Sequence, residues 1–276
     1  MRRQTDFRRD TQTVIWDIEL SPRLGWYYGV REVTPMKEVK PPTLLSFAWK
    51  WLGEKDGHCL TLYDRKGFDS YDDKLLVAEL WNVLDKCQLA IGHNSRNFDS
   101  KVVNSLFLKN NMTPPSPYKD VDTLQIARKY FRFENNKLDN LGKLLAGEGK
   151  TKVTYGDVWE DLMFGNEKEQ KRASKLMAKY NLNDVLVTEK IYKKMLPWAT
   201  NHPNMALYAG KELICPRCAN SVDFKVKSYR RTGVQINAIQ YQCKFCHAYV
   251  TRKLDKEERE ELREQGKLTS IFRNVV

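Results

Sequence analysis

Two acidic residues interrupt an apolar segment near the start of the chain. Asp17 and Glu19 lie within Val14–Leu20, a stretch whose other residues are all apolar and which predicts a buried strand. A strand points alternate side chains to one face, so the two carboxylates are expected to project together. A strand that is apolar on both faces rarely tolerates two carboxylates without a cation. The segment therefore predicts a divalent-metal site within an α/β domain.

Two later segments each supply one more acid. Asp99 ends the segment Gly92–Asp99, and Asp184 lies in a long helical pattern at 167–196. Tyr180 precedes Asp184 by four residues, so the two side chains are expected to share a helix face. Four carboxylates can hold two divalent ions for in-line attack of water on a phosphodiester.

These segments resemble the three motifs of the DnaQ-like 3′–5′ exonucleases, the DEDD group of the ribonuclease H-like superfamily. The motifs are Asp-x-Glu, Asn-x-x-x-Phe/Tyr-Asp and Tyr-x-x-x-Asp, and the tyrosine of the third is typical of one branch of the group. The resemblance covers roughly residues 10–197. The matching residues are Asp17, Glu19, Asn94, Phe98, Asp99, Tyr180 and Asp184.

The resemblance implies two Mg²⁺ or Mn²⁺ ions in the active site. Asp17, Glu19 and Asp184 would ligate the more tightly held ion, and Asp17 would bridge to the second. Asp99 would act mainly through water, and Tyr180 would orient the attacking water.

The second motif also supplies two expected contacts to nucleic acid. Asn94 is expected to support the substrate or the local turn, and Phe98 is expected to pack beneath the site. Helix capping is the alternative role for Asn94 and Asp99. Asp122, in the stretch between the second and third motifs, is expected to be structural.

Periodicity along the chain predicts alternating strands and helices, which indicates an α/β fold. The resemblance implies the ribonuclease H-like form of it, a mixed sheet flanked by helices. The expected strands are 12–20, 44–51, 58–63 and 89–92, and the expected helices are 72–85, 98–108, 139–145 and 167–196, with a strand that turns helical at 121–131.

Four of the six cysteines form two Cys-x-x-Cys pairs. Cys215 and Cys218 are separated by 24 residues from Cys243 and Cys246, which is the spacing of a structural zinc site. The pattern resembles a zinc ribbon that holds one Zn²⁺, and a redox role for the pairs is the alternative. The two remaining cysteines, Cys59 and Cys87, are expected to be reduced core residues.

Basic residues are concentrated around these cysteines. The whole chain has a formal net charge of +12, and residues 211–253 contain nine Lys/Arg against two Asp/Glu. This density predicts nucleic-acid binding, with a solvated surface as the alternative. Aromatic residues between them are expected either to stack on bases or to form the core of the ribbon. The basic residues proposed as contacts are Lys225, Lys227, Arg230, Arg231 and Lys244.

The end of the chain resembles a peptide that binds a sliding clamp. The matching positions are Gln265, Leu268, Ile271 and Phe272, although Ile271 stands where that motif has an aromatic residue. A tail folded onto its own domain is the alternative. The expected organisation is a basic tail (1–10), an exonuclease domain (11–197), a linker (198–210), the ribbon (211–253), and a charged helix with its tail (254–276).

The sequence thus predicts a metal-dependent 3′–5′ exonuclease, with single-stranded DNA as the favoured substrate. An RNA 3′ exonuclease, a structure-specific endonuclease and a non-catalytic nucleic-acid-binding module are the alternatives. A DNA polymerase is an expected partner. No membrane span or secretory signal is expected. The cysteine pattern favours a reducing compartment, either cytoplasmic or nucleoid-associated.

Overall fold

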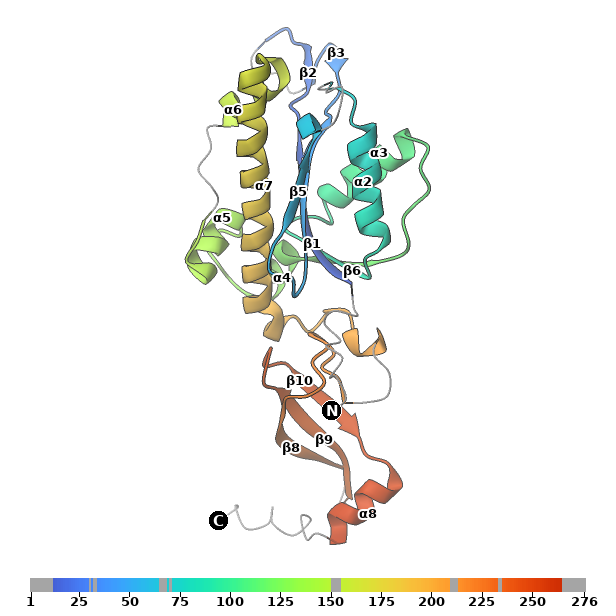
Figure 1. Cartoon of the computed structure of the whole chain (residues 1–276). Helices are drawn as coiled ribbons and strands as arrows, with labels where there is room; N and C mark the ends of the chain where they lie inside the picture. Colours follow the sequence, from blue (N-terminus) through green and yellow to red (C-terminus); the bar gives the residue numbers. More distant parts are fainter. Residues whose placement is uncertain are drawn as a thin grey trace. The chain divides into compact units, whose positions relative to one another are not determined.

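A computed structural model describes residues 12–29, 31, 34–64, 69, 71–149, 155–208, 213–232 and 235–264. The chain divides between Met195 and Leu196 into two compact units, which Figure 1 shows in one view. The expected tails at 1–10 and 265–276 lie outside the described residues. Within the described part of the chain, no helix combines the length and the apolar character needed to cross a membrane.

The first unit is built on a five-stranded mixed sheet with the order β5-β4-β1-β6-β7. The central strand β1 pairs antiparallel with β4 and parallel with β6. The sheet also contains β5, antiparallel to β4, and β7, parallel to β6. The bounds are β1 Thr13–Leu20, β4 Leu44–Trp51, β5 His58–Thr61, β6 Leu89–Gly92 and β7 Lys119–Asp122.

Helices cover both faces of this sheet, α2 and α3 on one side and α7 on the other (Figure 1). Alternate β1 residues Val14, Trp16 and Ile18 belong to the hydrophobic cluster that contains buried residues of α2 and α3. The opposite face of β1 carries Asp17 and Glu19 toward α7. The prediction of a mixed α/β sheet flanked by helices is confirmed. The bounds are α2 Lys74–Asp85, α3 Asp99–Lys109, α4 Thr123–Tyr130 and α7 Glu167–Met195.

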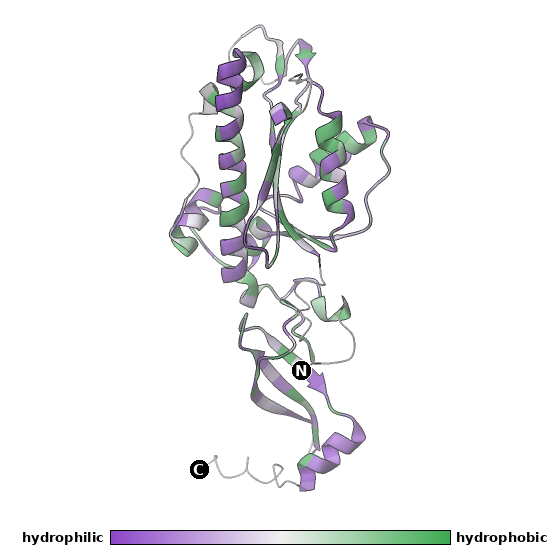
Figure 2. Cartoon of the chain, viewed as in Figure 1, coloured by the Kyte–Doolittle hydropathy of each residue, from purple (hydrophilic) through white to green (hydrophobic). Residues whose placement is uncertain are grey.

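The long helix α7 forms because buried residues recur along it every three or four positions. Examples are Ala173, Met177, Tyr180 and Asp184, which place one stripe against the sheet. Figure 2 shows hydrophilic and hydrophobic residues alternating along its length. The helix ends two residues before Pro197, which lacks the backbone N–H needed to continue it.

The strand expected at 58–63 ends at Thr61, where the 3-10 turn η1 (Leu62–Asp64) begins, and two strands and one α-helix of this unit were not expected from the sequence. The two strands, β2 (Leu24–Trp26) and β3 (Lys37–Lys40), pair as a short hairpin between β1 and β4. The helix is α6 (Tyr155–Phe164), which precedes α7. The helix expected at 139–145 is α5 (Leu138–Leu141), which continues as a wider turn to Ala146 and ends at Gly147 with a φ of 70°.

The second unit contains a three-stranded antiparallel sheet with the order β10-β9-β8. Its small core consists of Ile236, Ile239 and Leu254. The segment expected to be a linker, 198–210, includes the 3-10 turn η4 (Met205–Tyr208), whose Met205 is buried. The remaining elements are η3 Leu196–Trp198, β8 Phe224–Thr232, β9 Gln235–Cys243, β10 Tyr249–Lys253 and α8 Lys256–Glu264.

Candidate active site and zinc site

Three of the four predicted acids lie together in the first unit. Ligand oxygens of Asp17, Glu19 and Asp184 all lie within 4.8 Å of one another. The alternation of β1 supplies the first two, and the buried stripe of α7 supplies the third. Asp184 is almost fully buried, whereas Asp17 and Glu19 are half-buried. Oxygen donors at this spacing fit a hard divalent cation such as Mg²⁺ or Mn²⁺.

The fourth acid, Asp99, lies outside this three-carboxylate group. It is the first residue of α3, is buried, and interacts with the backbone amide of Ile18, between Asp17 and Glu19. Burial raises the pKa of Asp99 to about 7, and the nearby charges of Asp122 and Asp120 add to this rise. Without a cation, Asp99 therefore holds its proton far more strongly than an ordinary aspartic acid does.

The turn before Asp99 is held by carboxylates of β7. The backbone N–H of Asn94 donates a hydrogen bond to Asp122 Oδ1 over 2.9 Å, and Asn94 adopts a left-handed φ of 66°. Asp122 Oδ1 also accepts from the Leu124 amide, so it caps α4 as well. Asp122 thus ties β7, α4 and the Asn94 turn together.

Asp120 performs a similar task two residues earlier on β7. Its two carboxylate oxygens accept hydrogen bonds from Ser95 Oγ (3.1 Å) and Ser100 Oγ (2.7 Å). Sequence reasoning missed this residue. The alternation Asp120-x-Asp122 beside an expected strand was the signal that could have found it.

Phe98 does not pack as expected, although its predicted contact with nucleic acid stays a prediction. Phe98 was expected to pack beneath the site, but its side chain is 49% exposed. It occupies the position just before α3, where the chain turns from the Asn94 turn into the helix. About half of the Phe98 side chain is therefore in contact with solvent. The buried apolar residues of α3 are instead Val103, Leu106 and Phe107.

Tyr180 lies one helical turn before Asp184 and is 2% exposed. Its ring meets the ring of Trp159 edge-on, with 6.3 Å between the centroids. Trp159 Nε1 in turn donates to the carbonyl oxygen of Leu20 over 2.8 Å. Since Leu20 follows Glu19, this chain of contacts fixes Tyr180 close to the C-terminal end of β1.

A groove opens beside the three carboxylates. It has a volume of about 640 Å³, and its lining is mainly apolar. It lies between the end of β1 and α6, so a helix that was not expected from the sequence forms one wall. The lining includes Glu19, Leu24, Tyr71, Trp159, Met163 and Phe164.

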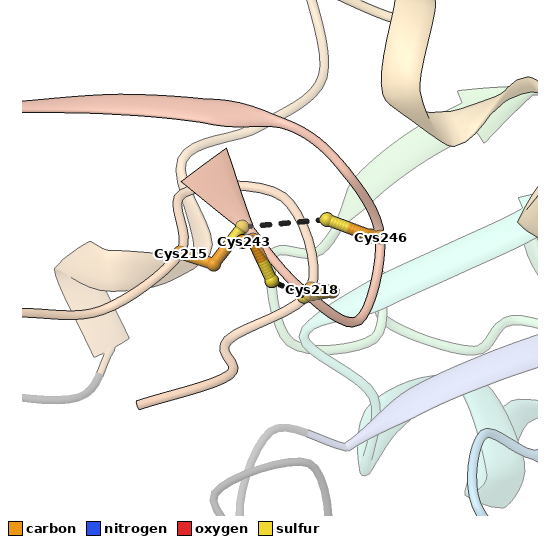
Figure 3. A group of neighbouring side chains, drawn as sticks. All are labelled: Cys215, Cys218, Cys243 and Cys246. Carbon is orange, nitrogen blue, oxygen red and sulfur yellow. Dashed lines mark hydrogen bonds between the residues drawn. The ribbon is translucent and has the colours of Figure 1, made fainter. Parts of the chain in front are cut away.

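The four predicted zinc cysteines converge in the second unit, as Figure 3 shows. Their sulfur atoms all lie within 4.8 Å of one another. Cys215 Sγ is 3.5 Å from Cys246 Sγ, and Cys218 Sγ is 3.7 Å from Cys243 Sγ. Four buried thiols in one cluster match the soft donor set of a structural zinc site.

The two cysteine turns have the same backbone construction. In each, the amide of the fifth residue donates to the carbonyl of the first cysteine: Ala219 to Cys215 (3.0 Å) and His247 to Cys243 (2.9 Å). Both fifth residues adopt a left-handed φ, 56° for Ala219 and 59° for His247. Asn220 Nδ2 also lies 3.4 Å from Cys243 Sγ, where it can donate to the sulfur.

The proposed basic contacts lie on β8 and at the second cysteine turn. The side chains of Lys225, Lys227, Arg230 and Lys244 are exposed, and that of Arg231 is half-buried. Among the aromatics between them, Tyr229 and Tyr241 pack against the small core, whereas Phe245 is 54% exposed. The core role therefore applies to the two tyrosines.

The two remaining cysteines are separate from this cluster. Cys87 is buried and Cys59, on β5, is half-buried; neither forms a disulfide. Burial raises the pKa of each thiol to about 12, so both stay protonated near neutral pH.

Comparison with protein families matches residues 51–196 to the RNase H superfamily. This range includes Asp99 and Asp184 and begins after β1. No curated protein sequence matches the chain. Similar solved structures include the family B DNA polymerase from the hyperthermophilic archaeon Pyrobaculum calidifontis. That alignment has 15% identity and a TM-score of 0.48, and it covers 68% of this chain but only 25% of the polymerase.

Proposed function

Because the chain belongs to the RNase H superfamily, we propose that it is a nuclease that uses divalent metal ions to hydrolyse phosphodiester bonds. In its finer form, the proposal is a 3′–5′ exonuclease that acts on single-stranded DNA and releases 5′-monophosphates. The convergence of Asp17, Glu19 and Asp184 is the observation that supports it most directly. Three carboxylates this close repel one another unless bound protons or a cation neutralise their negative charges.

In this proposal, the acidic residues bind the metal ions and Tyr180 positions the attacking water. Asp17, Glu19 and Asp184 would hold one Mg²⁺ or Mn²⁺, and Asp17 and Asp99 would serve a second. Bound ions of this kind lower the pKa of an attacking water and offset charge on the leaving oxygen. The Tyr180 hydroxyl would position the water, and its ring is already fixed by contact with Trp159.

The groove supports a single-stranded substrate. Its volume of about 640 Å³ lies in the usual range for small-ligand sites, and aromatic residues line it next to Glu19. An unpaired terminal base could stack there, whereas a base held in a duplex could not enter. Excluding water from this groove would also strengthen interactions between the carboxylates and their cations.

The second unit is proposed to bind zinc and to add affinity for the substrate backbone. The four clustered cysteines would hold one Zn²⁺, which a unit with such a small core needs in order to fold. Exposed Lys225, Lys227 and Arg230 would contact phosphates. A DNA polymerase and a sliding clamp remain proposed partners, the clamp through the peptide 265–272.

Digestion of 5′-labelled single-stranded DNA and RNA tests the proposal. The reactions contain Mg²⁺, Mn²⁺ or chelator, and they compare the native protein with Asp17→Asn and with Asp56→Asn, an exposed acid on the β4–β5 turn. We expect a ladder that shortens from the 3′ end, requires metal, and falls by at least about a hundredfold in Asp17→Asn but not in Asp56→Asn.

Other outcomes would assign the alternatives. Faster shortening of RNA would indicate an RNA exonuclease, and internal cuts in branched or flapped duplexes would indicate an endonuclease. Binding of nucleic acid without cleavage in either Mg²⁺ or Mn²⁺ would indicate a non-catalytic nucleic-acid-binding module.

A further inference from the structure

The β2–β3 hairpin exposes aromatic rings beside basic side chains, and we infer that it binds single-stranded nucleic acid by base stacking. This inference rests on the proposed function, because the strand it would hold is the substrate of the carboxylate site. The hairpin would carry the part of the strand that extends beyond the groove.

Three consecutive aromatic side chains of the hairpin are exposed. Trp26 is 64% exposed, Tyr28 81% and Tyr27 40%. Trp16 and Trp159, in the same unit, are 1% and 7% exposed. Solvent-facing aromatics grouped on one short hairpin mark a binding surface more often than single exposed apolar residues do.

Positive charge accompanies the rings. Residues 23–40 contain four Lys/Arg and two Asp/Glu, and one of these acids, Glu38, is paired with Arg23 at 3.0 Å. Lys37 lies directly opposite Trp26 in the hairpin register, and directly opposed residues share a face. A lysine opposite an exposed tryptophan suits a nucleotide, whose base can stack while its phosphate meets the cation.

The two strands of the hairpin pack closely together around Gly25 and Trp26. A Cβ at Gly25 would lie 2.6 Å from Pro35 Cβ, so the glycine lets the proline pack closely against the strand. The Met36 amide donates to the Trp26 carbonyl over 2.8 Å. Binding to a hairpin whose backbone is already ordered costs less conformational entropy than binding to one that must first be ordered.

The hairpin is continuous with the groove at the carboxylates. Arg23 and Leu24, at the start of the hairpin, line the same groove as Glu19. Lys40, at its end, places Nζ 4.4 Å from the ring centroid of Tyr71, another lining residue. A strand with one end in the groove would therefore lie next to the start of the hairpin.

Single-stranded nucleic acid fits this surface better than a protein partner does. Every base has a face that can stack, and the backbone supplies the negative charge that Lys37 and Lys40 complement. The two-stranded hairpin is too short to offer a large apolar interface of its own.

The test compares two double variants that differ only in whether the rings are kept. Trp26→Leu/Tyr28→Leu keeps apolar bulk without a ring, and Trp26→Phe/Tyr28→Phe keeps a ring at each position. Leu108→Ala removes an exposed apolar residue of α3 as a control. Binding of fluorescent oligo-dT and oligo-U of about 20 nucleotides is measured in chelator. Hydrolysis of the p-nitrophenyl ester of thymidine 5′-monophosphate is measured with Mn²⁺.

We expect the leucine variant to bind the oligonucleotides at least about tenfold more weakly, and the phenylalanine variant to stay within about threefold of the native protein. Hydrolysis of the one-base ester, which is too short to reach beyond the groove, should be unchanged in both. Ring-dependent binding without any hydrolysis would retain the hairpin inference and refute the proposed nuclease.

Equal affinities in the leucine and native proteins would overturn the inference, as would a native protein that binds neither oligonucleotide. Sedimentation of the same variants identifies one competing occupant. A dimer lost only in the leucine variant, with unchanged oligonucleotide affinity, would assign the surface to a second copy of the chain.

Discussion

Lys50 on β4 and Glu189 on α7 form a buried ion pair, with Nζ 2.5 Å from Oε2. Both side chains are less than a tenth exposed. Burial alone would raise the pKa of Glu189, but hydrogen bonds from Lys193 and Lys50 outweigh it and lower the pKa. The pair joins the sheet face that carries Asp17 to the helix that carries Asp184.

Removing the buried cation should destabilise the protein. Lys50→Met leaves Glu189 buried with only the half-exposed Lys193 as its partner, so we expect a loss of about 3 kcal/mol in the free energy of unfolding. Lys193→Met is the control, with an expected loss below about 1 kcal/mol. Urea denaturation measures both, and equal losses would contradict a dominant role for the buried pair.

Asp99 should make the metal-free protein less stable as pH rises. Its pKa increases on folding to about 7, so the native state binds this proton more tightly than the unfolded state does. The stability that it contributes is therefore greatest at low pH and falls between about pH 4 and pH 7. Asp99→Asn should flatten this part of the stability curve and raise the melting temperature at pH 8 in chelator. Asp56→Asn should leave the curve unchanged.

The Tyr180 hydroxyl should matter more to turnover than to folding. Tyr180→Phe keeps the ring on Trp159, so we expect a stability change within about 1 kcal/mol. If the hydroxyl positions the attacking water, kcat should fall at least about tenfold with little change in KM. Tyr192→Phe, a buried tyrosine farther along α7, is the matched control. Equal kcat values in the two variants would remove Tyr180 from the mechanism.

Loss of one clustered cysteine should release zinc and unfold only the second unit. Cys243→Ser leaves three thiolates, and the small core of Ile236, Ile239 and Leu254 cannot compensate. Elemental analysis should find zinc in the native protein and in Cys59→Ser, but not in Cys243→Ser. Hydrogen exchange should then rise across 213–264 while 12–195 stay protected. A native protein that folds fully without zinc would contradict this.

Neutralising the exposed lysines of β8 should weaken the dependence of binding on salt. If Lys225 and Lys227 each contact a phosphate, changing both to Gln should reduce the slope of log affinity against log salt by about 1.4 for a single strand. Lys171→Gln/Lys175→Gln, on the exposed face of α7, is the control. Identical slopes for the two double variants would argue against phosphate contacts on β8.

The sequence predicted the elements with a clear apolar pattern. β1 could be identified from its continuous apolar run, and α7 from apolar residues that recur at helical spacing; β1 starts and ends within a residue of its expected bounds. The hairpin β2–β3 could not, since its strands are three and four residues long and lie mostly on the surface. For α6, the helical spacing of Val158, Trp159, Leu162 and Met163 was a signal that went unrecognised.

In the candidate site, too, some features follow from local sequence spacing and others only from the tertiary structure. Local spacing suffices to bring Asp17 and Glu19 to one face, and to place Tyr180 beside Asp184. The groove depends on α6 packing beside Leu20, a contact between residues 139 positions apart. The burial of Asp99, which raises its pKa, likewise depends on how α3 meets β1. Only tertiary structure fixes such relations.

The continuity of α7 limits how this chain could change in length. Tyr180, Asp184 and Glu189 lie on one continuous helix. Each residue inserted into a helix rotates the part that follows it by about 100°. An insertion between Asp184 and Glu189 would thus turn either the carboxylate away from β1 or the ion pair away from Lys50. Insertions in the exposed turn at 53–56, between β4 and β5, would displace neither contact. Length variation among natural relatives should therefore collect in such turns and be absent from this part of α7.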